Sequence, residues 1–216
     1  MSTVEEQLIQ NAEADWLQRW TTGPTEPETQ PLMRGTKAPD LTLLDDGGRQ
    51  RRLSEFWTGQ PALLMFWRHF GCGCGTDRAT RLKAEWSAYA EAGLSPVIIG
   101  QGEPDRAARY RREHDLAGTI LCDPDYLAYG AYGVGQWSVE RVLFDAPLEY
   151  WSHPAELGAN LQKERRASGR LMVDDPWRAT AEFVVDIEGR IRFTHAYQHC
   201  EDFPDARVLT TAARLI

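Results

Sequence analysis

The chain has 216 residues, of which 42% are hydrophobic and 26% are charged, a composition typical of a folded globular protein and unlike that of a disordered chain. Its 24 Lys and Arg residues against 32 Asp and Glu residues give a formal net charge of −8. Because this charge repels phosphate backbones and anionic lipid surfaces, we expect no nucleic-acid partner and no membrane partner.

The amino-terminal segment, residues 1–6, is acidic and has no apolar run behind it, so it resembles neither a secretory signal nor a transit peptide. The longest apolar run, residues 62–67, is far too short to cross a bilayer as a helix. We therefore expect a cytoplasmic protein. In that compartment the four cysteines are more typical of catalytic, metal-binding or buried roles than of structural disulfides.

The first predicted element is an amphipathic helix over residues 3–21. Its apolar residues recur three or four positions apart, which places them on one stripe: Leu8, Ile9, Ala12, Trp16, Leu17 and Trp20. Residues 21–31 contain several prolines among Thr and Glu and predict a linker. We assign residues 1–32 to this helix and its Pro-rich linker. Because exposed tryptophans are poorly soluble, we expect the helix to dock on its own domain or on a second subunit of a homodimer.

Residues 33–216 are assigned to one domain in which strands and helices alternate. Apolar or alternating runs predict strands over residues 38–44, 62–67, 95–100 and 118–122, and helical spacing predicts helices over residues 76–92, 105–114 and 126–134. A β-hairpin over residues 182–195 and a helix over residues 206–215 are expected to close the chain. Strands that alternate with helices at this spacing predict βαβ units in an α/β fold.

The segment 135–178 has weak periodicity, and we treat it as an insertion before the hairpin. It contains three tryptophans, Trp137, Trp151 and Trp177. Two interpretations stay open at this point. The three rings form an apolar wall over the cysteine loop described next, or they form a contact between two subunits.

Two cysteines one residue apart lie in the glycine-rich loop at residues 71–75, after a predicted buried strand and before a predicted helix. Open α/β sheets place their functional sites at this kind of junction. The amino terminus of a helix stabilises anions, so it should lower the pKa of the Cys72 or Cys74 thiol, and the neighbouring Arg68 should add to this effect. The resulting thiolate is a nucleophile toward disulfides and peroxides.

The Cys-Gly-Cys spacing of Cys72 and Cys74 requires a local bend before the two sulfurs can join, which the flanking glycines permit. A strained bridge of this kind is easily reduced and is typical of a redox couple. Two other interpretations remain. The cysteines are inert packing residues, or they bind a metal together with His69, or with His199 and Cys200. We favour the redox interpretation.

Cys122, Cys200 and His69 lie outside this loop. Cys122 ends a predicted buried strand and is expected to pack in the core. Cys200 lies in a loop after the hairpin, where it is able in principle to resolve an oxidised Cys72, but a single loop cysteine is more typical of an incidental residue. His69 adjoins the cysteine loop and is a candidate general base.

The first half of the chain contains four segments that resemble members of one family. Three of them are similar to the opening of peroxiredoxins and related redoxins: Ala-Pro-Asp at residues 38–40, Gly-Gly at 47–48 and Leu-Ser-Glu-Phe at 53–56. The fourth, Arg-His-Phe-Gly-Cys at residues 68–72, resembles the segment before the first cysteine in the peroxiredoxin-like branch of the AhpC/TSA superfamily.

The end of the chain continues this resemblance. Residues 183–195, followed by Asp-Phe-Pro at 202–204, are similar to the terminal hairpin and the Asp-x-Pro of the same branch. The resemblance therefore covers residues 33–215, with an interruption at 135–178. It implies a thioredoxin-like fold with a central mixed sheet flanked by helices, extended here by the amino-terminal helix and by the insertion.

The resemblance also implies thiol-based redox chemistry, with Cys72 at the nucleophile position. The sequence departs from the family pattern at several positions. Met65 and His69 stand where peroxiredoxins place Pro and Thr or Ser, and the usual spacing of the two cysteines is shortened by one residue. Thr180 stands where they place an arginine, and Arg178 lies two residues away. Because the peroxide-orienting hydroxyl is missing, we expect disulfide exchange to be less affected than peroxide reduction.

We therefore predict a thiol-dependent oxidoreductase that reduces a peroxide or a disulfide. In this hypothesis Cys72 and Cys74 form the redox pair, Arg68 stabilises the thiolate, and an external thiol reductant reopens the bridge. We predict no cofactor and no metal. A thioredoxin-fold binding module without activity and a metal-handling protein with Cys and His ligands remain as alternatives.

Overall fold

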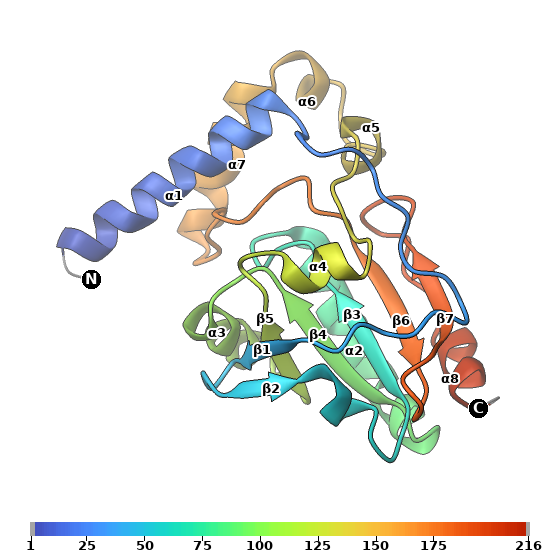
Figure 1. Cartoon of the computed structure of the whole chain (residues 1–216). Coiled ribbons are helices and arrows are strands. Elements are labelled where there is room, and N and C mark those ends of the chain that lie inside the picture. Colours follow the sequence, from blue (N-terminus) through green and yellow to red (C-terminus); the bar gives the residue numbers. More distant parts are fainter. Residues whose placement is uncertain (1–2, 215–216) are drawn as a thin grey trace.

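A continuous apolar strand, β3 (Ala62–Phe66), lies inside the seven-stranded sheet and is buried along its whole length. The computed structural model describes residues 3–214. β3 pairs in parallel with β4 (Ser95–Gly100) on one side and antiparallel with β6 (Ala181–Val185) on the other. The sheet is therefore mixed, as predicted, and its strand order is β2-β1-β5-β4-β3-β6-β7 (Figure 1).

The outer strands complete the sheet on both sides. β5 (Thr119–Cys122) pairs in parallel with β4, which confirms the predicted βαβ units. β7 (Ile191–Ala196) pairs antiparallel with β6 and forms the second strand of the expected hairpin. On the other side, β1 (Thr42–Asp45) pairs antiparallel with β5 and with a short charged strand, β2 (Gln50–Arg52), which the sequence did not predict.

The first strand begins later than predicted. The sequence predicts a strand from residue 38, but pairing begins at Thr42. Pro39 has no N–H group to donate to a neighbouring strand. The Asp40 carboxylate accepts hydrogen bonds from the Ser54 backbone N–H at 2.9 Å and from Arg52 Nε at 2.7 Å. These contacts hold the segment outside the strand pairing.

Helices cover both faces of the sheet. One face packs against α2 (Gly73–Glu91), α3 (Pro104–His114) and α8 (Ala206–Arg214). The opposite face packs against α4 (Leu127–Ala131) and the 3-10 turn η1 (Leu53–Phe56). The apolar side chains of the central strands alternate between these two clusters, as the two-residue period of a strand requires. The last position of the predicted closing helix, residue 215, lies outside the described residues.

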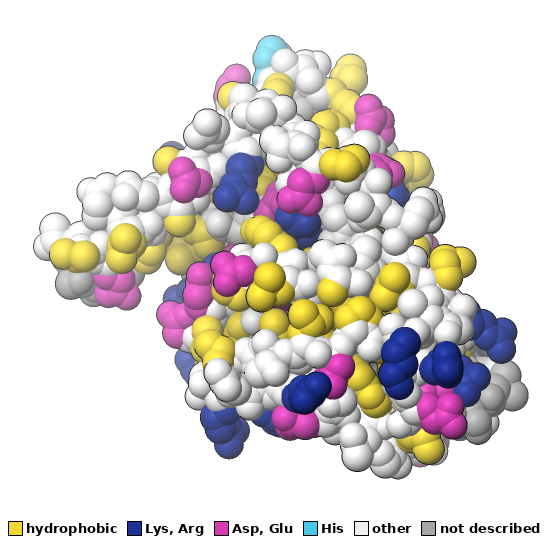
Figure 2. All heavy atoms as spheres, viewed as in Figure 1, with side chains coloured by type: hydrophobic (Ala, Val, Ile, Leu, Met, Phe, Trp, Pro, Cys, Tyr) yellow, Lys and Arg dark blue, Asp and Glu magenta, His cyan; other side chains and the backbone are white. Residues whose placement is uncertain are grey.

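The segment 135–178, in which the sequence predicted no particular helix or strand, contains three helices. They are α5 (Val139–Val142), α6 (Glu149–Ser152) and α7 (Pro154–Ala167). α7 runs beside the amino-terminal helix α1 (Thr3–Thr22), and the two form an arm that projects from the sheet (Figure 1). Figure 2 shows hydrophobic side chains along the side of this arm that faces the body of the molecule. Among residues 3–214, no helix is long and apolar enough to cross a membrane.

The amino-terminal helix docks on its own chain through stacked tryptophans. The ring centroids of Trp16 and Trp20 lie 5.3 Å apart, and those of Trp20 and Trp177 lie 5.2 Å apart. Trp177 Nε1 donates a hydrogen bond to the Arg19 carbonyl at 2.8 Å. Trp20 Nε1 donates one to the Pro154 carbonyl at 2.9 Å. The helix was expected to dock on its own domain or on a second subunit, and in the structure it docks on its own chain.

The three tryptophans of the insertion have different environments. Trp137 and Trp177 are each 2% exposed, whereas Trp151 is 41% exposed. The guanidinium of Arg68 lies 5.9 Å from the centroid of the Trp137 ring. Trp137 is therefore part of the wall around the cysteine site, and Trp177 supports the arm. The interpretation in which all three rings form that wall is wrong for Trp151, because its side chain lies at the surface.

We expect the packing of the arm to depend on Gly158 in α7. A Cβ atom at this position would lie 2.5 Å from Trp20 Cδ1 and 2.9 Å from Leu17 Cδ1, so Gly158→Ala should force α1 away from α7. Overpacking of this kind costs about 1–3 kcal/mol, to be measured as the free energy of unfolding in urea. Gly130→Ala in α4 is the matched control, because nothing lies within 4 Å of a Cβ there. Equal losses in the free energy of unfolding for Gly158→Ala and Gly130→Ala would contradict this packing.

Candidate active site

The loop between β3 and α2 carries the two neighbouring cysteines. Cys72 immediately precedes the first turn of α2, and Cys74 lies within that turn. Both therefore lie at the positive end of the helix dipole, where a thiolate is stabilised. The loop passes very close to a second segment. A Cβ atom at Gly71 would lie 2.5 Å from the Leu171 carbonyl oxygen and 2.8 Å from Met172 Sδ, so a larger residue does not fit there.

The guanidinium group of Arg68 forms the centre of the site. The residue is only 6% exposed. Its Nη1 atom donates to three sulfur atoms: Cys72 Sγ at 3.5 Å, Cys74 Sγ at 3.9 Å and Cys200 Sγ at 2.9 Å. Burial acts to lower the pKa of Arg68, but the charges of the three sulfurs raise it, so the group stays a cation. One buried positive charge is thus shared by three cysteines.

The three thiols differ in acidity because they are hydrogen-bonded to one another. The hydrogen bond with Cys74, and then the charges of Arg68 and His69, hold the pKa of Cys72 well below its usual range despite burial. Hydrogen bonds with Cys200 and Cys72, and then burial, hold the pKa of Cys74 well above its usual range. The hydrogen bond with Cys74, and then the charge of Arg68, lower the pKa of Cys200 against burial. These directions favour ionisation of Cys72 over ionisation of Cys74.

Three buried polar groups near the cysteine loop have no hydrogen-bond partner among the described residues: Trp67 Nε1, His69 Nδ1 and the Tyr110 hydroxyl. The Tyr110 hydroxyl lies 3.3 Å from the position that a Cβ atom would occupy at Gly75, in the first turn of α2. Burial, and then the charges of the two loop cysteines, raise the pKa of Tyr110 well above its ordinary value. This hydroxyl therefore stays protonated and has a proton to donate to another atom.

The sequence favours an incidental loop residue at Cys200, but its sulfur lies 2.9 Å from Arg68 Nη1. It follows β7 and is separated from Arg68 by 132 positions, so no local spacing indicated the contact. The Tyr110 hydroxyl was also missed, because its ring lies on the apolar face of α3. Cys122, in contrast, is buried in β5 as expected, and burial raises its pKa to about 12.

The residues near the expected arginine position have other partners. The Thr180 hydroxyl donates to the Phe66 carbonyl. The Arg178 guanidinium forms ion pairs with Glu26 at 2.9 Å and with Asp175 at 3.1 Å. Two carboxylates therefore hold the Arg178 charge, whereas the Arg68 charge is directed at the sulfurs.

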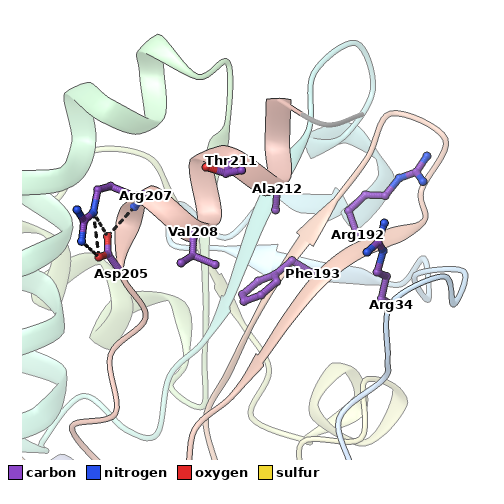
Figure 3. Close-up of a pocket in the computed structure, with 8 residues that line it drawn as sticks. All are labelled: Arg34, Arg192, Phe193, Asp205, Arg207, Val208, Thr211 and Ala212. Atoms are coloured by element: carbon purple, nitrogen blue, oxygen red, sulfur yellow. Dashed lines mark hydrogen bonds and ion pairs between the residues drawn. The ribbon is translucent and has the colours of Figure 1, made fainter.

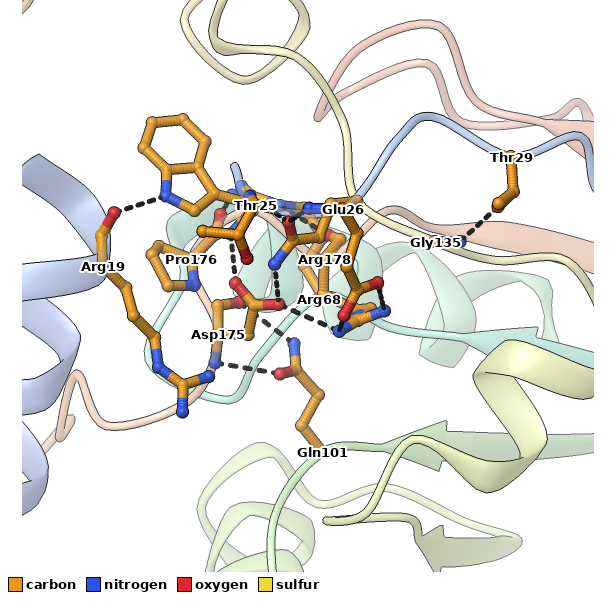
Figure 4. Close-up of polar contacts among 12 residues, drawn as sticks. Arg19, Thr25, Glu26, Thr29, Arg68, Gln101, Gly135, Asp175, Pro176 and Arg178 are labelled. Atoms are coloured by element: carbon orange, nitrogen blue, oxygen red, sulfur yellow. Dashed lines mark hydrogen bonds and ion pairs between the residues drawn. The ribbon is translucent and has the colours of Figure 1, made fainter. Parts of the chain in front are cut away.

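A polar network ties the amino-terminal linker to the segment that holds Arg68 (Figure 4). Arg68 donates hydrogen bonds to the backbone carbonyls of Pro176 and Arg178. The Gln136 side chain accepts hydrogen bonds from two linker N–H groups at 2.7 and 2.8 Å, and donates one to Asp175 at 2.8 Å. The linker therefore helps to fix the two carbonyl groups that orient Arg68.

A narrow cavity of about 20 Å³ lies between Arg68, Cys74 and Cys200. This volume holds about one water molecule, so the cavity accepts a small group and not a bulky one. A wider pocket of about 520 Å³ lies between β7 and α8 (Figure 3). Its lining contains no cysteine: Arg34, Arg192, Phe193, Asp205, Arg207, Val208, Thr211 and Ala212. Because redox chemistry needs the thiols, we place the candidate site at Arg68, with the narrow cavity that Cys74 and Cys200 line and with Cys72, whose Sγ lies 3.5 Å from Arg68 Nη1.

The metal-binding alternative finds no support in this geometry. Across residues 3–214, no group of three or more His, Cys, Asp or Glu side chains is arranged to hold a metal ion. The His199 ring instead stacks on Phe144, with centroids 4.8 Å apart. The Arg68 cation, which contacts all three sulfurs, would also repel a metal cation at the same place.

Two curated relatives are similar to about half of this chain. The chloroplastic thioredoxin-like protein AAED1 of Arabidopsis thaliana is 30% identical over 91 residues, which are 42% of this chain and 37% of that protein. Peroxiredoxin Bcp of Escherichia coli (strain K12) is 30% identical over 105 residues, which are 48% of this chain and 66% of that protein. In each case the match spans less than two thirds of the relative.

Solved structures resemble this chain over a larger part of its length. Peroxidoxin BcpB from Mycobacterium tuberculosis matches with a TM-score of 0.61 and 18% identity, over 86% of this chain and 98% of that one. At this identity the likeness concerns the fold alone, and it confirms the predicted thioredoxin-like α/β fold. The sequence model of the AhpC/TSA family matches residues 34–194, which is most of the chain. The chain therefore belongs to the AhpC/TSA family.

Proposed function

We propose that this protein is a thiol-dependent oxidoreductase that reduces a peroxide or a disulfide through Cys72 and Cys74. The observation that carries the proposal is the contact of one buried nitrogen, Arg68 Nη1, with Cys72 Sγ at 3.5 Å and Cys74 Sγ at 3.9 Å. A buried cation beside a thiol at a helix amino terminus favours the reactive thiolate. Membership of the AhpC/TSA family and similarity to a protein named peroxiredoxin support the same chemistry.

The order of acidities suggests the order of steps. The Cys72 thiolate attacks one oxygen of a peroxide and the O–O bond breaks. Cys72 becomes a sulfenic acid, and the leaving oxygen takes a proton to give an alcohol or water. The Cys74 thiol then attacks the Cys72 sulfur, and water leaves as the disulfide forms. Two external thiols then return the oxidised protein to its reduced form and are themselves oxidised to a disulfide.

A disulfide substrate follows the same route. The Cys72 thiolate attacks one sulfur of the substrate and forms a mixed disulfide, while the first half of the substrate leaves as a thiolate. Cys74 then displaces the second half, which also leaves as a thiolate and takes up the Cys74 proton. Both routes end with the same bridge between Cys72 and Cys74.

Two groups besides the sulfurs have a role in this proposal. The Arg68 cation stabilises negative charge on Cys72 before the attack and on the departing atom afterwards. The Tyr110 hydroxyl is buried and has no hydrogen-bond partner within residues 3–214, so it is available to donate a hydrogen bond to a peroxide oxygen. It supplies the kind of group that peroxiredoxins place at the position occupied here by His69.

Replacement of the nucleophile tests the proposal directly. Cys72→Ser is expected to abolish the reduction of hydrogen peroxide and of a small disulfide by dithiothreitol, because a serine hydroxyl is not ionised near neutral pH. Cys122→Ala, which removes a thiol buried in β5, should retain turnover. Turnover of the Cys72→Ser protein at the wild-type rate would contradict the proposal.

Removal of the buried cation should change the pH dependence. Since Arg68 helps to lower the pKa of Cys72, the wild-type rate of peroxide consumption should stay high at pH values below the ordinary thiol range. In Arg68→Met the pH at which the rate is half its maximum should be higher. For each pH unit by which this midpoint lies above neutrality, the rate at neutral pH should be about tenfold lower. Arg207→Met, at an exposed arginine paired with Asp205, is the control. Identical pH profiles for all three proteins would refute a role for Arg68.

The Tyr110 hydroxyl should distinguish the two substrate classes. Tyr110→Phe removes a buried hydroxyl that no described residue hydrogen-bonds, so the fold should be retained. The rate with hydrogen peroxide is expected to fall by about tenfold, since one hydrogen bond in the transition state is worth on the order of 1–2 kcal/mol. The rate with a disulfide should change little. An equal loss with both substrates would show that the hydroxyl does not act on the peroxide.

A further inference from the structure

Cys200 takes no part in the reaction proposed above, yet its sulfur is the closest of the three to Arg68. The distance from Arg68 Nη1 is 2.9 Å to Cys200 Sγ, against 3.5 Å to Cys72 Sγ and 3.9 Å to Cys74 Sγ. Cys74 and Cys200 line the same narrow cavity, and Arg68 Nη1 contacts the sulfurs of both. The Cys74 side chain thus shares Arg68 with Cys72 at the start of α2 and with Cys200 in the segment after β7.

Cys200 also connects the interior of the site with a pocket outside it. Its side chain lines the narrow cavity of about 20 Å³ that it shares with Cys74 and Arg68. It also lines an outer pocket of about 210 Å³, together with Val142, Phe144, Asp145, Ala146, His199 and Glu201. Cys74, in contrast, is buried, with 9% of its surface exposed. A thiol that enters from the outer pocket would therefore meet Cys200 first.

We propose that Cys200 is the last thiol of a three-cysteine relay, which takes the disulfide over from Cys72 and presents it to an external thiol in the outer pocket. This inference rests on the proposed function, because it requires that the bridge between Cys72 and Cys74 forms first. In the relay the reductant opens a bridge between Cys74 and Cys200, and it does so in the outer pocket.

The transfer step is balanced within the protein. The Cys200 thiolate attacks the Cys74 sulfur of the first bridge, a bond forms between Cys74 and Cys200, and the bond between Cys72 and Cys74 breaks. The electron pair leaves on Cys72, so the protein gains and loses no electrons. A sulfur whose thiolate is stabilised is a good leaving group, and Arg68 remains in place to stabilise it on Cys72. The peroxide-reactive thiolate is thus regenerated before any reductant arrives.

The second step uses the external thiol. Its thiolate attacks the Cys200 sulfur, forms a mixed disulfide, and displaces Cys74, which takes up a proton. A second external thiol then attacks the mixed disulfide, which releases the oxidised reductant and frees Cys200. The outer pocket of about 210 Å³ has room for a small thiol, whereas the inner cavity of about 20 Å³ does not. Of the two cavities that Cys200 lines, the outer pocket is therefore the one from which a small thiol reaches its sulfur.

The relay is tested by following the bridges over time. The reduced protein is mixed with one equivalent of hydrogen peroxide, quenched with an alkylating reagent at increasing times, and its disulfide-linked peptides are identified by mass spectrometry. In the wild type we expect a bridge between Cys72 and Cys74 first and a bridge between Cys74 and Cys200 later. In Cys200→Ser the first bridge should accumulate. Peroxide turnover with dithiothreitol should then fall at least tenfold while the first equivalent is consumed at the wild-type rate.

Controls separate the relay from effects on folding and from the proposed function itself. Cys200→Ala should behave as Cys200→Ser does, and Cys122→Ala should turn over as the wild type does. The relay is overturned if the first bridge is the final one in the wild type, or if Cys200→Ser turns over at the wild-type rate. Rapid consumption of the first equivalent by Cys72→Ser would instead overturn the proposed function.

Discussion

The buried positive charge of Arg68 is the constraint on which the site depends. A buried cation is costly unless it is paired and hydrogen-bonded. The hydrogen bonds that Arg68 makes with described residues go to sulfur atoms and to the carbonyls of Pro176 and Arg178. Carbonyl oxygens supply partial charge only, so a thiolate is the partner that compensates the cation. In the proposed function, the stability of the buried arginine and the reactivity of the cysteine loop therefore have the same physical cause.

The elements outside the sheet contribute to this arrangement. The segment that supplies the two carbonyls is held by Asp175, Gln136 and the linker that follows α1. The Arg178 side chain pairs with Glu26 of the same linker at 2.9 Å. The division of the chain into residues 1–32 and 33–216 stays a prediction. These contacts nevertheless connect the amino-terminal segment to the support of the site.

The parts of the fold that the sequence predicted correctly are those with a strong local pattern. The buried run of β3, the helix α1 and the loop with Cys72 and Cys74 each follow from residues that are close in sequence. The predicted apolar stripe of α1 is wrong at Leu8, which is 64% exposed. The short helices α5 and α6 were not predicted, because they have only four residues each and too few positions to show a period. The placement of Cys200 depends on tertiary contacts alone. For that reason one of the three sulfurs at Arg68 was expected to be incidental.

The central claim, that a buried arginine keeps Cys72 ionised, is tested most directly by the ultraviolet absorbance of thiolates as a function of pH. The reduced wild-type protein and Cys72→Ser would be titrated side by side. The account predicts a thiolate that is already present in the wild type at neutral pH, below the usual thiol pKa of about 8.5, and that is lost in Cys72→Ser. A wild-type curve in which all 4 cysteines titrate at or above about 8.5 would contradict it.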